Sequence, residues 1–505
     1  MKTKATKLLC LILAGLMLLS TLVACGTETD DPKDEQTTAG SSNESETVDE
    51  NQAALNELKD ALGTAGDWEG EDFVVLYNAA FKNEVYGENG TVDKEGGSSQ
   101  VINDAVYERN SLFEDFGNLT WGVVEKDPGA LQTTVQNEAS APTGDFHLID
   151  HRLGDSATLA TGGFLYNMFD LGMTLDGPWW DSGTAEFVLA GGVYFMSGSL
   201  NFGDDGVTYV LIFNKEMQRT YQNSVPNPYQ TARDGEWTLA YFYDVIQGIS
   251  ADNGDGKWDE LDTYGFINTW EYGNTFFIGS DLRYINNTDG EGDISLFLTD
   301  KAQMEKALDV LELSQAIYHN NNASYMSPPG SEGLGQTAFK ENRGLFYGEV
   351  VNHLTPLTQE MEGEFGILPV PKYDKAQQFY RTWTHASGST FSVTSAIPEA
   401  KAETMGILLE AYAVLSHQYL KPAYYDIMLT SRNVHDAESA EMMDLMFSNR
   451  VYEMSFYFNS FGFFELFKTA TNDNTDSFSS NYAKKEKSFN RALKTLLGKL
   501  EKKRG

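Results

Sequence analysis

Phe73–Tyr77 (FVVLY) is a short apolar run directly followed by the polar Asn78. A run of this length, rich in β-branched and aromatic residues, predicts a buried strand. Further along, apolar residues between Val101 and Phe116 recur with the spacing of an amphipathic helix. This part of the chain therefore predicts a strand, a loop and a core-facing helix.

The same alternation continues along the chain. Further strands are predicted at Asp145–Asp150, Tyr209–Phe213, Tyr264–Ile267 and Phe365–Leu368. Core-facing helices are predicted at Ala302–Tyr318 and Ala400–Tyr419, where apolar residues recur every three or four positions. Alternating strands and helices indicate layered α/β units with mainly parallel sheets. The stretch after Trp68 is long enough for two core-forming units.

The first 25 residues have the pattern of an export signal. Three lysines precede an apolar run over Leu8–Leu22, which is too short for a comfortable membrane span. The run ends in LVAC, which looks like a bacterial lipobox with Cys25 as the acylated residue. We therefore predict a signal peptide over residues 1–24 and an extracytoplasmic protein that is lipid-anchored to the cell membrane through Cys25. An ordinary secretory signal with a chance cysteine is the alternative.

Composition excludes several classes of protein. Cys10 lies in the segment that is expected to be removed, so the mature chain has no cysteine pair for a disulfide or a zinc–thiolate site. The net charge is −38, and removal of three lysines and no acids with the signal makes it −41. Such acidity argues against nucleic acid as a partner and against binding of anionic lipid head groups. Residues 25–67 are poor in apolar residues and predict a flexible acidic linker after the lipidated cysteine, with one short helical stretch near Ala53–Leu62.

Five short segments of the folded part occur in the order and spacing of one known family. They are INDAVYERN at Ile102–Asn110, PWWD at Pro178–Asp181, FNKE at Phe213–Glu216, GEWTL at Gly235–Leu239 and ILPVPK at Ile367–Lys372. None of them is specific alone. Together, and behind a lipobox, they resemble the bacterial extracellular solute-binding proteins of family 1, which are substrate-binding lipoproteins of sugar ABC transporters.

The resemblance implies an α/β, two-lobed fold of the periplasmic-binding-protein type II, with a ligand cleft between the lobes and crossover hinge strands. The expected domains are lobe 1 over 68–190 with about 392–432, lobe 2 over 213–384 with about 435–505, and hinges near 191–212 and 385–391. The implied function is capture of a carbohydrate, expected to be an oligosaccharide, and its delivery to an ABC transporter permease and the associated ATPase. No cofactor and no catalytic residue are expected.

A sugar site needs flat aromatic platforms and polar groups around the hydroxyl rim. Candidates at strand ends or near the crossovers are Asn78, His151, Arg152, Trp180, Trp270, Tyr347, Glu349 and Trp383. The resemblance places Trp270, Tyr347, Glu349 and Trp383 near the ligand. Other interpretations remain open: a loop-capping Asn78, an ion pair of His151 or Arg152 with Asp155, buried core tryptophans and an exposed glutamate.

Ala251–Asp262 resembles a calcium-binding EF-hand loop. Asn253, Asp255, Asp259 and Asp262 fall at ligand positions. Position one is Ala251, however, and Asp262 is shorter than the usual bidentate glutamate. A tight acidic turn without metal is therefore the preferred interpretation, with calcium as the alternative.

Two other functions stay open from the sequence. The same fold could bind a peptide, a polyamine or another small solute, because cleft residues decide the ligand and the fold does not. A secreted carbohydrate-active enzyme would need two carboxylates across a cleft, and the chain has 74 acidic residues. No metalloprotease, serine-hydrolase or phosphate-loop motif is present, so a binding protein is the favoured interpretation.

Overall fold

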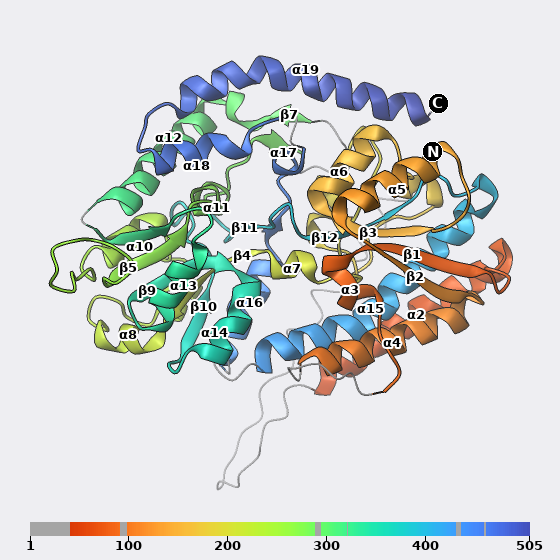
Figure 1. The fold of residues 1–505 in the computed structure, drawn as a ribbon, viewed down its shortest axis with the longest axis horizontal. Coiled ribbons are helices and arrows are strands. Elements are labelled where there is room, and N and C mark those ends of the chain that lie inside the picture. Colours follow the sequence, from red (N-terminus) through yellow and green to blue (C-terminus); the bar gives the residue numbers. More distant parts are fainter. Residues whose placement is uncertain are drawn as a thin grey trace, which may run out of the picture. The chain divides into compact units, whose positions relative to one another are not determined.

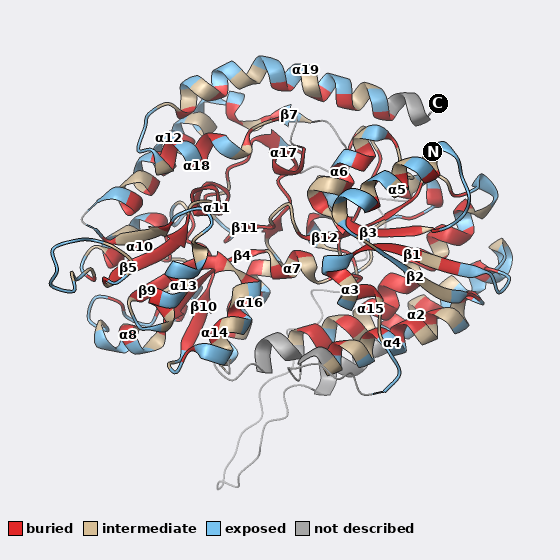
Figure 2. Cartoon of the chain, viewed as in Figure 1, coloured by how far each residue is buried: buried red, intermediate tan, exposed pale blue. Residues whose placement is uncertain are grey.

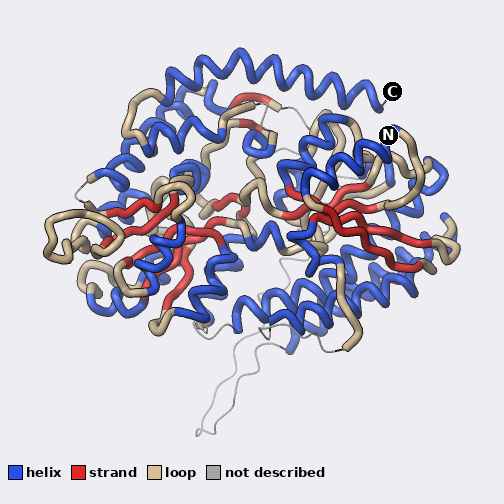
Figure 3. The backbone as a smooth tube through the Cα atoms, viewed as in Figure 1, coloured by secondary structure: helices blue, strands red, loops and turns tan. Residues whose placement is uncertain are grey.

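Two separate sheets form the frames of two lobes, as Figures 1 and 3 show. The computed structural model describes residues 41–90, 98–287, 294–320, 322–430, 436–458 and 461–504. The predicted signal peptide and Cys25 lie outside these ranges. Residues Glu50–Gly505 form one compact unit by themselves. Within the described ranges, every helix is too short or too polar to cross a membrane.

Lobe 1 is built on a four-stranded sheet of order β12-β3-β1-β2, in which β12 alone is antiparallel to its neighbour. The strands are β1 (Asp72–Asn78), β2 (Thr120–Lys126), β3 (Leu148–Arg152) and β12 (Ser389–Val393). Its helices are α3 (Lys82–Val85), α4 (Ser98–Gly117), α5 (Pro128–Ser140), α6 (Leu153–Gly162) and α15 (Ala402–Thr430). The predicted strand at Phe73–Tyr77 is confirmed as β1 and the predicted helix at Val101–Phe116 as α4. The strand predicted at Asp145–Asp150 begins later, at Leu148.

Lobe 2 is built on a five-stranded sheet of order β10-β4-β9-β5-β8. The strands are β4 (Tyr209–Asn214), β5 (Tyr264–Thr269), β8 (Ser324–Ser327), β9 (Gly344–Val350) and β10 (Phe365–Leu368). The helices are α8 (Lys215–Thr220), α9 (Pro228–Arg233), α10 (Leu239–Ile246), α11 (Tyr272–Gly279), α12 (Lys301–His319), α13 (Glu332–Lys340), α14 (Leu354–Glu360), α16 (Ala437–Phe447) and α18 (Phe464–Asn472). β5 runs parallel to β8 and β9, whereas β4 and β10 are antiparallel. The sheet is therefore mixed, although the alternation of strands and helices predicted mainly parallel pairing.

Two of the segments that carried the family resemblance contact each other in lobe 2. Trp237 is fully buried, and its indole Nε1 donates a hydrogen bond to the carbonyl oxygen of Pro369 at 2.9 Å. Thr238 pairs with Lys372 in a parallel bridge. These contacts hold the start of α10 against the chain that leaves β10. The two segments, Gly235–Leu239 and Ile367–Lys372, are therefore parts of one packing arrangement.

The region expected to be a flexible linker contains helix α2 (Ser41–Ala65). In its second half, Leu55 and Leu62 are buried in the main hydrophobic core. Lys59 Nζ donates to the carbonyl oxygen of Phe116 at 2.5 Å. The helix from Glu50 onward is therefore part of the folded body, because two leucines seven residues apart lie on the same face of the helix.

A buried arginine joins the segments that cross between the lobes. β13 (Arg450–Val451) pairs with β11 (Thr382–Trp383), and Thr208 forms a bridge with Thr384. Arg450 is buried and forms ion pairs with Asp181, Asp204 and Asp205. Burial raises the pKa of Asp204 well above its usual range, and Arg450 offsets this only in part. Burial also opposes ionisation of Asp181, but Arg450 and Tyr452 outweigh it and lower the pKa of Asp181.

Helix α19 (Phe478–Arg504) contacts elements of both lobes at the top of Figure 1: α6 of lobe 1, and α12 and α18 of lobe 2. Figure 2 shows one buried and one exposed side along it. The buried side carries Phe489, Leu493, Leu496 and Leu500. This apolar stripe fixes the helix to the body.

We expect Arg450→Met to lower the free energy of unfolding by about 3–5 kcal/mol, because it leaves the buried Asp204 and the partly buried Asp181 and Asp205 without their counter-ion. Arg219→Ala is the matched control. Its ion pair with Glu364 is more than half exposed, so its loss should cost about 1 kcal/mol or less. Urea unfolding followed by circular dichroism measures both changes. Equal, small effects of the two substitutions would contradict this role of Arg450.

Candidate functional site

The carboxyl ends of β5 and β9 lie side by side at one edge of the lobe 2 sheet. The two strands are parallel neighbours, with Asn268 opposite Gly348. Trp270 and Glu271 follow β5 directly, and Glu349 is the penultimate residue of β9. In parallel sheets this edge is where ligands bind. We therefore take these three residues as the starting point of the candidate site.

Tyr209 and His385 bring the crossover segments to the same edge. The hydroxyl of Tyr209 donates to Oε2 of Glu271 at 2.9 Å. Nε2 of His385 lies 3.7 Å from the same carboxylate oxygen. The ring of Tyr209 stacks on Trp383 at 4.6 Å, and the Trp383 indole Nε1 donates to Oγ1 of Thr275 at 2.9 Å. Trp383 is fully buried and supports the site from behind.

Glu349 binds two neighbours within lobe 2. The hydroxyl of Tyr347 donates to its Oε2 at 3.3 Å, and Nδ1 of His353 lies 3.2 Å from the same oxygen. Burial opposes protonation of His353, but Glu349 and Glu332 outweigh it and raise the pKa of His353. Tyr347 is fully buried and stacks on Phe339. The structure thus brings two predicted residues, Tyr347 and Glu349, into one hydrogen-bonded group.

A lysine from a distant helix covers Trp270. Nζ of Lys468, on α18, lies 3.6 Å from the centre of the Trp270 ring and 4.1 Å from that of Phe464. The ammonium group also forms an ion pair with Glu465 at 2.9 Å. Burial lowers the pKa of Lys468. The side chain of Lys468 is 1 % exposed, whereas Trp270 is half-buried.

The lobe 1 candidates form a second group at the ends of β1 and β3. Nδ2 of Asn78 lies 3.5 Å from Nδ1 of His151, and Oδ1 of Asn78 caps the next turn by accepting from the Ala80 amide. Burial, reinforced by the charge of Arg152, lowers the pKa of His151 to about 4, so this imidazole is neutral at pH 7. Its Nε2 lies 3.6 Å from Asp155.

The charge of Arg152 influences the crossover residue His385. Burial lowers the pKa of His385, and the positive charges of Lys468 and Arg152 act in the same direction, against Glu271. The electrostatic influence of Arg152 therefore reaches from lobe 1 to a residue that contacts lobe 2. Arg152 itself is half-buried.

Trp180 belongs to neither group. Its indole Nε1 donates to Oε2 of Glu410 on α15 at 3.1 Å, and Trp179 donates to the same oxygen at 2.7 Å. Trp180 is 6 % exposed. In the described part of the chain, no hydrogen bond or ring contact joins it to the other seven candidates.

Burial divides the eight candidates into two kinds. Trp270 and Arg152 are half-buried. The others are buried: Asn78, His151, Trp180, Tyr347, Glu349 and Trp383. In this conformation a solute could touch the first kind directly, whereas the second kind acts by holding neighbours in place. The ligand-binding role of each of the eight residues stays a prediction.

Five residues of this arrangement were not among the sequence-based candidates: Tyr209, Glu271, His353, His385 and Lys468. Glu271 and His385 could have been found, because each lies within two residues of a predicted tryptophan at a strand end. Lys468 gave no such signal, since nothing in the sequence relates α18 to β5. The arrangement offers carboxylates, imidazoles, a guanidinium group and an indole ring, the set of groups that binds hydroxyl-rich solutes.

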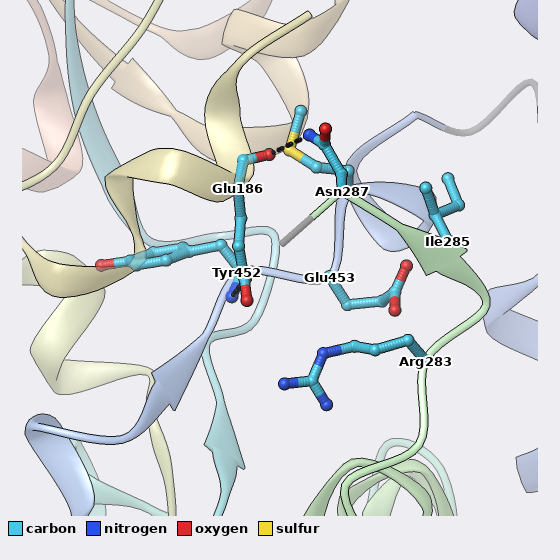
Figure 4. A pocket seen from close by; sticks show the side chains of 7 residues that line it. Glu186, Arg283, Ile285, Asn287, Tyr452 and Glu453 are labelled. Carbon is cyan, nitrogen blue, oxygen red and sulfur yellow. Dashed lines mark hydrogen bonds between the residues drawn. The ribbon is translucent and has the colours of Figure 1, made fainter. Parts of the chain in front are cut away.

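A small cavity near the crossovers is lined by Glu186, Arg283 and Glu453 (Figure 4). Nδ2 of Asn287 donates to the Glu186 carbonyl oxygen at 2.8 Å. Burial raises the pKa of Glu186 to about 7. The volume is about 10 Å³, enough for about one water molecule. This cavity is far too small for a sugar.

The loop with EF-hand spacing folds as a series of turns held by its own side chains. Asp262 is 1 % exposed, and its two carboxylate oxygens accept from the amides of Asn253 and Asp259, each at 2.8 Å. Asn253 accepts from the Asp255 amide, and Asp255 from the Lys257 amide. Residues 251–262 are all described, and they bring together no three side chains suited to a metal ion. This geometry fits the metal-free acidic turn, and calcium binding stays a prediction without support from it.

Comparison with known proteins identifies the fold. No family model and no curated protein matches the chain. Among solved structures it is similar to a cyclo/maltodextrin-binding protein complexed with maltotetraose, at 14% identity and a TM-score of 0.52, covering 85% of this chain and 97% of that one. It is also similar to a sugar transporter from Rhizobium etli in an open conformation, at 13% identity and a TM-score of 0.51, covering 85% and 99%. UspC from M. tuberculosis matches at 11% identity and a TM-score of 0.50, covering 85% and 100%.

At these low sequence identities, the similarity concerns the fold alone. The mixed α/β architecture and the coverage of whole structures define a two-lobed protein of the periplasmic-binding-protein type, with strands that cross between the lobes. The fold class inferred from the order of short segments is confirmed.

For the acidic loop, we expect the same thermal unfolding midpoint in calcium and in chelator, because backbone amides already occupy the carboxylate oxygens. We expect Asp262→Ala to lower the free energy of unfolding by about 1–3 kcal/mol, since two amides lose a buried acceptor. Asp255→Ala is the control: Asp255 is exposed and accepts a single amide bond. A calcium-dependent rise in the midpoint that Asp262→Ala abolishes would instead support the metal site.

Proposed function

We propose that this protein is the solute-binding component of an ABC importer and that it holds a carbohydrate between its two lobes without changing it chemically. The observation that carries the proposal is the group formed by Trp270, Glu271 and His385. This group lies where two parallel strands end and where the crossover segments arrive, in a two-lobed fold. A binding protein of this architecture encloses its solute by closing two lobes on it.

The chemistry of the group favours a sugar over an apolar solute. Trp270 offers a half-buried indole ring for the apolar face of a sugar. The hydroxyl groups around the rim of the sugar need hydrogen-bond partners. Glu271 accepts hydrogen bonds, Arg152 donates them, and His385 can do either in its neutral form. The side chains of His385 and Glu271 are 30% and 19% exposed, so both are open to a solute.

The buried candidates have a supporting role in this proposal. Tyr209 and Trp383 stack behind Glu271, and Asn78 contacts His151, the residue before Arg152 in β3. Fixing the polar groups before the ligand arrives reduces the entropy lost on binding. The same reasoning extends to Tyr347 and Glu349, which hold His353 at the end of β9.

The proposal includes a permease and its ATPase as partners, an oligosaccharide as the preferred ligand and attachment to the membrane through a lipid on Cys25. The lipobox-like sequence before Cys25 supports the anchor. The ligand and the anchor are each tested by an experiment of their own.

For ligand binding, a thermal-shift panel of mono- and oligosaccharides, peptides and polyamines first identifies the solute. We then expect Trp270→Ala and Glu271→Gln each to weaken binding by about tenfold or more, or about 1.4 kcal/mol, in titration calorimetry. Trp258→Ala is the matched control, because this tryptophan is 40% exposed on the acidic loop. Unchanged affinity in both site variants would reject the site, and shortened oligosaccharides after incubation would reject a binding protein in favour of an enzyme.

For the anchor, we expect Cys25→Ser to abolish labelling by a fatty acid and to release the protein from the membrane fraction, because acyl chains hold it there. Cys10→Ser is the control, since it changes the only other cysteine and lies inside the predicted signal peptide. Metabolic labelling and fractionation of cells measure both variants. Persistent labelling of Cys25→Ser would refute the lipid anchor.

A further inference from the structure

Helix α19 reverses the charge of the rest of the chain. Its basic residues are Lys484, Lys485, Lys487, Arg491, Lys494, Lys499, Lys502, Lys503 and Arg504, and its acidic residues are Glu486 and Glu501. The helix therefore has a net charge of +7, whereas the whole chain has −38. A quarter of all lysines and arginines lie in this one helix, since the chain has 36. Binding of a solute between the lobes does not require such a cluster of lysines and arginines on α19.

The exposed cations of α19 gather on one face. Lys484, Lys487, Arg491, Lys494 and Lys499 are exposed and are spaced by three, four, three and five residues, which keeps them on one side of a helix. We call these five residues the cationic face. The opposite side carries the buried apolar residues, and Phe489 packs on Phe461 at 4.9 Å and on Phe463 at 5.1 Å. The apolar side is thus already occupied by the protein's own core.

The cationic face has no acidic partner among the described ion pairs of the chain. Several cations elsewhere on the surface have acidic partners: Arg233 of α9 pairs with Glu438 and Glu441, and Lys301 of α12 pairs with Glu305. In a chain with 74 acidic residues, five exposed cations without such a pair leave a surface of uncompensated positive charge.

A shallow groove runs beside the cationic face. It has a volume of about 610 Å³ and lies between α19 and Thr161 of α6. Lys484, Lys487, Arg491 and Lys499 line it together with Ser488, Thr495 and the apolar Ala492 and Leu496. Cationic and hydroxyl groups along one groove are suited to phosphate oxygens.

We propose that the cationic face of α19 binds the phosphate head groups of anionic lipids, and so docks the folded body on the membrane surface. Clustered lysines and arginines on an amphipathic helix are attracted to anionic lipids, and the attraction adds up over the residues near the surface. The rest of the chain is strongly acidic and is repelled by the same surface. The helix therefore sets the orientation in which the body meets the membrane.

The choice of a membrane as partner follows from the predicted lipid on Cys25, which would keep the body at the surface of a bilayer. Because the apolar side of α19 is packed on Phe461 and Phe463, binding is electrostatic and the helix does not insert. This replaces the expectation, drawn from net charge, that the chain avoids anionic lipid. Net charge averages over a surface, whereas a bilayer contacts one face.

This proposal does not depend on the identity of the solute, because none of the residues of the cationic face belongs to the candidate site. Membrane binding by α19 can also be tested independently of the lipid anchor. A chain that begins at residue 26 lacks Cys25 but keeps the whole compact unit 50–505. Any binding of this chain to vesicles cannot come from an acyl chain.

The test is co-sedimentation of the chain 26–505 with vesicles. We expect binding to vesicles of equal parts phosphatidylglycerol and phosphatidylcholine, and none to pure phosphatidylcholine. High salt should abolish the binding, since the screening length falls to about 3 Å at 1 M. Equal binding to both kinds of vesicle, or binding that high salt leaves unchanged, would overturn the proposal.

A fourfold variant carries Lys484→Gln, Lys487→Gln, Arg491→Gln and Lys499→Gln. Each lost cation should weaken vesicle binding by roughly fivefold, so the variant should show almost none. The matched control carries Lys257→Gln, Lys301→Gln, Lys375→Gln and Arg219→Gln, which removes the same charge from exposed positions outside α19. The control should bind as the unchanged chain does, and an equal loss in both variants would overturn the proposal.

Two further measurements keep the test decisive. If the fourfold variant has a lower thermal midpoint, the single variants Arg491→Gln and Lys487→Gln are compared instead, and normal vesicle binding in both would count against the proposal. Inorganic phosphate is then added at constant ionic strength. Persistent vesicle binding at a phosphate concentration equal to that of the accessible lipid head groups supports several contacts with a surface, whereas complete displacement at that concentration would make the groove a site for a free anion and would refute the membrane as partner.

Discussion

The ion pairs of Arg450 with Asp181, Asp204 and Asp205 are the constraint on which the arrangement of the two lobes depends. Arg450 is only 4% exposed and Asp204 1%, so water cannot compensate these two groups, whereas Asp181 and Asp205 are partly exposed. Each group is tolerated in the interior only because the others are there. Since the four residues come from three distant parts of the chain, the crossover segments must meet at this point.

The position of the candidate site follows from this constraint. Thr208 and Thr384 pair beside Arg450, and the next residues along the two segments are Tyr209 and His385. Both of these side chains contact Glu271 at the end of β5. The crossover therefore delivers an aromatic ring and an imidazole to a strand end of lobe 2. A site built in this way is sensitive to the geometry of the crossover, because part of it belongs to the segments that connect the lobes.

The net charge of this protein does not show how charge is distributed over its surface. Acidic residues dominate the chain, yet α19 has a net charge of +7 and contacts elements of both lobes. Buried carboxylates add a further contrast, since burial raises the pKa of Glu84 in lobe 1 and of Glu186 near the crossovers to about 7. Local surroundings, and not the sum of charges, decide which surface attracts an anion and which carboxyl group stays protonated.

Local sequence by itself determined the order and type of most elements. The apolar runs at Phe73–Tyr77 and Phe365–Leu368 and the periodic stretch at Ala302–Tyr318 became a strand, a strand and a helix, because periodicity is a property of neighbouring residues. Only the tertiary structure decided that Trp383 is buried, that Trp270 is half-exposed under Lys468, and that Glu271 meets Tyr209 and His385. These features depend on contacts between residues more than sixty positions apart, and no local pattern encodes which distant segments pack together.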